Sequence, residues 1–129
     1  MGKKNYIDKE RLDSLVLQYY ADGDFSSELE RSIRLIVDGV MSNWKWAWEK
    51  YPSWHRDDCY SDAYTQATQA IYKKKWKKRV DTDHAFSFIT KCVQYAILGQ
   101  RKRYASKQRA FNKYALDVLG ADENQENSL

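Results

Sequence analysis

The residues best suited to bind a metal or to act as an acid and a base lie together at positions 55–59. His55, Asp57, Asp58 and Cys59 supply an imidazole, two carboxylates and a thiol. The other histidine, His84, is distant in sequence, and neither histidine has a zinc-binding spacing such as H-E-x-x-H. The adjacent aspartates fit a helix N-terminus better than a catalytic pair. No phosphate-binding glycine loop or nucleophile elbow occurs, so we expect neither an enzyme nor a metal or cofactor site.

Positive charge is concentrated in one third of the chain. Residues 73–113 carry 13 basic and two acidic side chains, a net charge of +11, whereas residues 1–72 have a net charge of −3 and residues 114–129 of −4. Aromatic side chains are interleaved with these cations: Trp76, Phe86, Phe88, Tyr95, Tyr104 and Phe111. Cations neutralise phosphates and rings stack on unpaired bases, so the pattern predicts binding of single-stranded nucleic acid. A solvated lysine-rich helix face, the usual explanation of a charge run, does not account for the rings.

The overall composition is typical of one helical domain. The chain has 129 residues, 43% of them hydrophobic, with five glycines and the single proline Pro52. No apolar run long enough to span a membrane and no signal peptide occurs. The two cysteines do not suggest a disulfide framework. We therefore expect a reduced, cytoplasmic protein that does not enter a membrane.

Hydrophobic periodicity predicts the helices of the N-terminal half. A helix is expected over residues 8–21, closed by Gly23. Residues 29–51 form one apolar stripe, which predicts a single long helix that starts with a capping box at Ser27 and ends at Pro52.

A third helix is expected to start near Asp57 or Asp58, where a carboxylate suits a helix N-terminus. One of its faces is apolar and the opposite face is acidic and amide-rich, with Asp58, Asp62, Gln66 and Gln69. The basic run at residues 73–79 either extends this helix or forms a loop.

A fourth helix is expected after a cap at Thr82 or Asp83, with a bend or an end near Gly99. Its inward face contains Phe86, Ile89, Cys92, Val93, Ala96 and Ile97, and its other side shows Phe88, Lys91, Gln94 and Tyr95. The chain is therefore predicted to be an all-α, compact bundle of about four to five helices. Residues 1–114 form the domain, with its core helices within residues 27–104, and residues 115–129 form a C-terminal segment.

The order of these elements resembles the second conserved region of the sigma-70 family. Residues 58–72 are similar to the helix with which that family docks on the clamp coiled coil of the largest RNA polymerase subunit. Residues 86–98, which open Phe-Ser-Phe-Ile, resemble its promoter-melting helix. Cys92 and Val93 stand where the family has a tryptophan pair. The resemblance covers about residues 29–114.

This resemblance implies a phage-encoded sigma factor that binds host RNA polymerase core and opens an A/T-rich element upstream of late genes. It implies a polymerase-binding face formed by Asp58, Asp62, Gln66 and Gln69. It implies contacts with the melted promoter strand by Phe86, Phe88, Lys91, Gln94 and Tyr95. Phosphate contacts are expected from the basic extension that follows, at Arg101, Lys102, Arg103 and Lys107. The protein would then act in the cytoplasm of an infected bacterium.

Residues 33–41 and 84–92 are also similar to segments of the late sigma factors of T-even phages. Those factors lack the helix-turn-helix that reads the upstream promoter element, and they bind the sliding clamp through a hydrophobic-acidic C-terminal motif. Residues 115–122 resemble that motif, which makes Leu116, Asp117, Val118 and Leu119 candidate clamp-binding residues. The alternative is that these residues are the hydrophobic end of the last helix and close the bundle. A co-activator is a further possible partner.

Two other functions fit parts of the pattern. A polymerase-binding regulator, such as an anti-sigma factor or a co-activator, would use the acidic face without touching promoter bases, but the +11 segment disfavours it. A helical DNA-binding protein that acts without polymerase would use the basic segment, but the acidic-amide face disfavours it.

Overall fold

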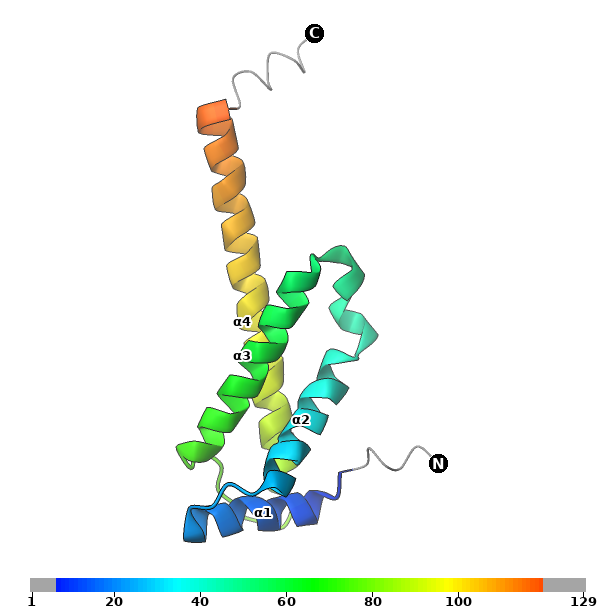
Figure 1. Ribbon diagram of the computed structural model, residues 1–129, viewed down its shortest axis with the longest axis vertical. Coiled ribbons are helices and arrows are strands. Elements are labelled where there is room, and N and C mark those ends of the chain that lie inside the picture. Colours follow the sequence, from blue (N-terminus) through cyan, green and yellow to red (C-terminus); the bar gives the residue numbers. More distant parts are fainter. Residues whose placement is uncertain (1–6, 120–129) are drawn as a thin grey trace.

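The computed structural model describes residues 7–119 and confirms the predicted all-α fold (Figure 1). Its elements, in chain order, are α1 (Lys9–Asp22), α2 (Ser27–Met41), 3-10 turns at Trp44–Trp46 and Trp48–Lys50, α3 (Ser53–Tyr72), α4 (Ala85–Tyr114) and a π-helical turn at Ala115–Leu119. Helix α1 lies across one end of the other three helices, and α4 continues well beyond the end of α3 (Figure 1). All residues of α4 from 105 to 114 are exposed, so this part of the helix is an arm outside the bundle.

One hydrophobic core joins all four helices. Helix α2 contributes five buried side chains: Leu29, Ile33, Ile36, Val37 and Met41. Helix α4 packs on them with Ile89, Val93 and Ile97, all of which are fully buried. The facing side of α3 has small residues, including the buried Ala63 and Ala67, and small side chains allow two helices to approach closely. The tight α3–α4 contact positions the polar side chains along both edges of this seam.

The prediction of one long helix over residues 29–51 is wrong, because α2 ends at Met41. The chain then turns twice, and Ala47 has a positive φ of 51°. Two tryptophans of the predicted stripe stabilise this ending: the indole N–H of Trp46 donates to the carbonyl of Val40 at 2.8 Å, and that of Trp48 donates to the carbonyl of Met41 at 2.6 Å. The last carbonyls of a helix have no partner within the helix, so indole donors can end it without a loss of hydrogen bonds.

Helix starts also differ from the predictions. Ser26, and not Ser27, caps α2, since its hydroxyl accepts from the Leu29 N–H at 3.1 Å. Helix α3 starts at Ser53, before the predicted start at Asp57 or Asp58, with Pro52 in extended conformation as the residue that precedes the helix.

The C-terminal half departs from the predictions at the start of α4 and at Gly99. Asp83 does not cap α4, because its carboxylate accepts from the N–H groups of Arg79 and Val80 in the preceding loop. Thr82 is not the cap either, since α4 begins only at Ala85. Of the bend or end predicted near Gly99, the end does not occur, because α4 continues to Tyr114. Of the two alternatives for the basic run, the loop is correct, since α3 ends at Tyr72.

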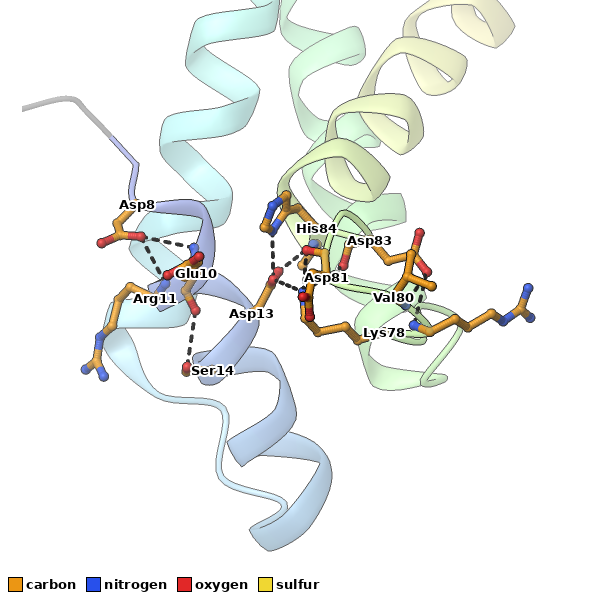
Figure 2. Close-up of polar contacts among 12 residues, drawn as sticks. Asp8, Glu10, Arg11, Asp13, Ser14, Lys78, Val80, Asp81, Asp83 and His84 are labelled. Atoms are coloured by element: carbon orange, nitrogen blue, oxygen red, sulfur yellow. Dashed lines mark hydrogen bonds and ion pairs between the residues drawn. The ribbon is translucent and has the colours of Figure 1, made fainter.

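The start of α4 is capped by a carboxylate from another helix. Asp13 of α1 is 3% exposed, and its side chain accepts from the Ala85 N–H at 2.7 Å, from Lys78 Nζ at 2.9 Å and forms a 2.8 Å contact with His84 Nδ1 (Figure 2). Burial opposes ionisation of this carboxyl, but the Ala85 N–H, Lys78 and His84 together outweigh burial and lower its pKa. Asp13 therefore ties three parts of the chain together: α1, the basic loop and α4.

We expect Asp13→Ala to destabilise the protein by about 3 kcal/mol, because it leaves a buried N–H and an ammonium group without their acceptor. Urea unfolding followed by far-UV circular dichroism measures this loss. The matched control is Asp24→Ala, which removes an exposed carboxylate after α1. Equal free energies of unfolding for the two variants would contradict the role of Asp13.

Candidate nucleic-acid interface

The loop between α3 and α4, residues 73–84, has a defined conformation although it contains no regular structure. Trp76 is 4% exposed, and its carbonyl accepts from the Tyr20 hydroxyl at 2.9 Å. Lys78 is held by Asp13 and also donates to the carbonyl of Asp81 at 3.1 Å (Figure 2). The other five basic side chains of the loop are exposed. Lys74 donates to the carbonyl of Tyr20 at 3.3 Å. The other four are Lys73, Lys75, Lys77 and Arg79.

A groove of about 690 Å³ lies between α3 and α4 and ends at this loop. Helix α4 lines it with Phe88, Lys91 and Tyr95, three of the residues predicted to contact the melted strand. Phe88 is half-buried, whereas Tyr95 is 66% exposed. The opposite wall is formed by residues of the predicted polymerase-binding face, and the loop adds two cations at the end; the groove thus also contains Asp62, Gln66, Gln69, Lys73 and Lys75.

The predicted DNA-binding residues do not share one face of α4. Phe86 and Gln94 line a separate groove of about 480 Å³ on the α2 side of the helix, together with Val40 and other apolar residues. The rotation of a helix by about 100° per residue explains this division, because Phe86 and Phe88 differ by about 200° around the axis. The prediction that Phe86, Phe88, Lys91, Gln94 and Tyr95 meet one strand is therefore met geometrically only by Phe88, Lys91 and Tyr95.

Arg101, predicted to contact phosphate, is engaged inside the protein instead. Its guanidinium lies 3.8 Å from the centre of the Tyr51 ring, and its Nε donates to Nε2 of His55 at 3.0 Å. A second guanidinium N–H donates to the carbonyl of Trp46, and the Trp48 ring lies 4.8 Å away. These contacts hold the turn after α2 against α4, which is a structural role that the charge pattern did not reveal.

The other three residues of the predicted phosphate track are exposed on α4. Arg103 pairs with Asp62 of α3 at 3.2 Å, so a predicted DNA contact and a predicted polymerase contact are joined across the seam. Asp62 also accepts from the Gln66 amide at 2.9 Å. Lys102 and Lys107 follow on the exposed side of the helix.

The cluster considered for metal binding is arranged around Arg101. His55 is 1% exposed, and burial and the neighbouring Arg101 lower its pKa, so the ring is neutral and Nε2 is an acceptor. Cys59 Sγ lies 3.7 Å from the same nitrogen, and burial raises the pKa of this thiol to about 11. Asp57 and Asp58 are exposed. Within residues 7–119, no three side chains of the metal-ligating types gather around one point.

The candidate clamp-binding segment lies outside the core. Leu116 is 58% and Val118 57% exposed, and Asp117 is also exposed. The backbone of Leu119 belongs to the π-helical turn, but its side chain is outside the described residues. The alternative interpretation required these hydrophobic residues to pack together and close the bundle. Phe111 is 65% exposed and Val118 is exposed as well, so they do not close it.

Comparisons with known proteins add no relative: the chain matches no protein-family model, no curated protein and no solved structure. Among the described helices, none combines the length and hydrophobicity needed to cross a bilayer. The likeness to sigma region 2 stays a prediction from the sequence. A functional proposal therefore has to be argued from the charges and rings of the groove and the loop.

We expect the stability of the protein to fall when His55 must accept a proton. Its pKa is lower in the folded state than in the unfolded chain, so stability is retained above about pH 6.5 and lost below it, by up to about 1.4 kcal/mol per pH unit. Urea unfolding between pH 5 and 7.5 measures the slope. In His55→Gln this part of the pH dependence should vanish, and an unchanged slope would show that another group causes it.

Proposed function

We propose that this chain is a small sigma-like transcription factor of phage type. In this proposal it binds bacterial RNA polymerase core through α3 and holds the unpaired strand of an A/T-rich promoter element along α4. It acts in the cytoplasm of the infected bacterium.

The observation that supports the proposal most directly is the composition of the groove between α3 and α4. Two aromatic rings, Phe88 and Tyr95, stand beside Lys91 and the loop cations Lys73 and Lys75. Stacking of a base on such a ring contributes about 1–3 kcal/mol and tolerates any base, whereas the cations attract the sugar-phosphate backbone. This combination suits a strand whose bases are already unpaired, as they are in an opened promoter.

The arrangement also supports two partners at once. Asp58, Gln66 and Gln69 are exposed on α3. Gln66 and Gln69 line the groove wall opposite Phe88, whereas Asp58 lies outside the groove. An acidic-amide surface orients a basic partner and speeds the encounter. A regulator that never touches promoter bases would have no use for an exposed ring such as Tyr95 among cations, so the groove favours the sigma-like function over that alternative.

Alanine at Phe88 and Tyr95 should reduce promoter opening by about tenfold or more, because two stacking contacts are lost while the cations remain. Permanganate reactivity of unpaired thymines, with bacterial core polymerase and late phage promoters, measures opening. Phe111→Ala is the matched control, since this exposed ring lies on the arm of α4 outside the groove. If the variant lost promoter opening and closed-complex binding to the same extent, the two rings would stabilise the protein by packing and would not stack on bases.

Charge reversal on α3 tests the polymerase contact separately. Asp58→Lys should weaken core-polymerase binding several-fold, because this exposed carboxylate lies outside the groove and is predicted to face a basic surface. Asp62 is left intact, since its pair with Arg103 would confound the result. Binding to immobilised core polymerase is the measurement, and unchanged binding by a variant of normal helicity would remove α3 as the docking surface.

A further inference from the structure

A second hollow, of about 430 Å³, lies where the basic loop meets the start of α4. Its lining is dominated by positive charge. Four cations and two hydroxyl groups surround it: Lys75, Lys77, Arg79, Lys91, Thr82 and Ser87. No part of the function proposed above uses Lys77, Arg79 or the hydroxyl groups.

The four cations of this hollow outnumber its single carboxylate, Asp83, and leave it with a net positive charge. Among residues 7–119, no ion pair is formed by these four cations, in contrast to the neighbouring Lys78, which Asp13 neutralises. The one acidic residue of the lining, Asp83, accepts from the N–H groups of Arg79 and Val80, at 3.0 and 3.2 Å. This carboxylate therefore shapes the loop. The hollow also lies at the positive end of the dipole of a 30-residue helix.

The hollow and the α3–α4 groove are neighbours that share Lys75, Phe88 and Lys91. A strand with bases on Phe88 and Tyr95 would have to place its backbone near these lysines. We propose that the hollow is a phosphate-binding subsite that holds one backbone phosphate of that strand. This inference rests on the proposed binding of an unpaired strand, but it does not depend on polymerase.

A fixed subsite differs from a diffuse positive surface in one measurable way. A diffuse surface attracts all phosphates alike, whereas a subsite makes charge-assisted hydrogen bonds to one of them. Arg79 can donate two parallel N–H groups to phosphate oxygens, and Lys77 supplies a point charge. Contacts of Asp13, Trp76 and Asp83 hold the loop in place. The backbone positions from which the Lys77 and Arg79 side chains extend are therefore fixed. The bound phosphate would then set the register of the bases in the groove.

The test uses the full chain and a labelled single-stranded oligonucleotide just long enough to span the groove and the hollow, so that it binds in one register. One phosphate at a time is replaced by a neutral methylphosphonate. Fluorescence anisotropy gives the affinity for each. For the unaltered protein, we expect one linkage whose neutralisation weakens binding about tenfold, and at most about twofold effects at the others. In the double variant Lys77→Gln with Arg79→Gln, neutralising that linkage should weaken binding no more than neutralising any other. The control variant, Arg31→Gln with Lys50→Gln, removes the same charge from exposed positions outside the hollow and should keep the larger effect of that linkage.

Equal effects at every linkage, or the same loss in the control variant, would overturn the subsite. So would absence of measurable strand binding. Pyrophosphate, added alone and as a competitor, distinguishes a strand from a small free anion. If it binds as tightly as the oligonucleotide and depends equally on Lys77 and Arg79, the hollow is a site for free phosphate compounds. None of these binding experiments contains polymerase. A negative result here is therefore distinguishable from a negative result in the promoter-opening assay.

Discussion

The buried carboxylate of Asp13 is the interaction on which the candidate interface depends. It comes from α1, yet it caps α4 and neutralises Lys78 of the basic loop. A loop with many lysines repels itself and would otherwise sample many conformations. Asp13, together with the Tyr20 hydroxyl on the carbonyl of Trp76, holds the backbone of this loop beside the groove. Helix α1 is thus a support for the basic surface, although it contributes no residue to the groove.

The seam between α3 and α4 places the two proposed partner surfaces side by side. Arg103 of α4 pairs with Asp62 of α3, and Gln66 and Phe88 line the same groove. In the proposed function, polymerase and the promoter strand would meet along this seam. Binding of one partner can therefore alter the contacts of the other through the same side chains, as for linked sites in general.

The turn between α2 and α3 has a different architecture, built on aromatic rings around one cation. Arg101 lies on the Tyr51 ring and donates to His55, while Trp46 and Trp48 end α2 with their indole N–H groups. These rings explain why this arginine is unavailable to phosphate although its neighbours on α4 are exposed. They also explain the neutral state of His55, because a protonated ring could not accept from the guanidinium.

The sequence by itself determined the helical class, the extent of α1 and the inward face of α4, since hydrophobic periodicity depends only on local geometry. It also identified the basic-aromatic segment and the exposed acidic-amide face of α3. It did not determine where α2 ends or what caps α4, because Trp46, Trp48 and Asp13 act on backbone groups that they reach only after folding. Helical periodicity already separated Phe86 from Phe88, but tertiary packing decided that Gln94 lies in the groove on the α2 side and not beside Tyr95. The aromatic turn after α2 likewise decided that Arg101 is enclosed while Lys102 is exposed. Charge and aromaticity can be read along a chain, but whether a side chain faces solvent or another side chain is decided by tertiary packing.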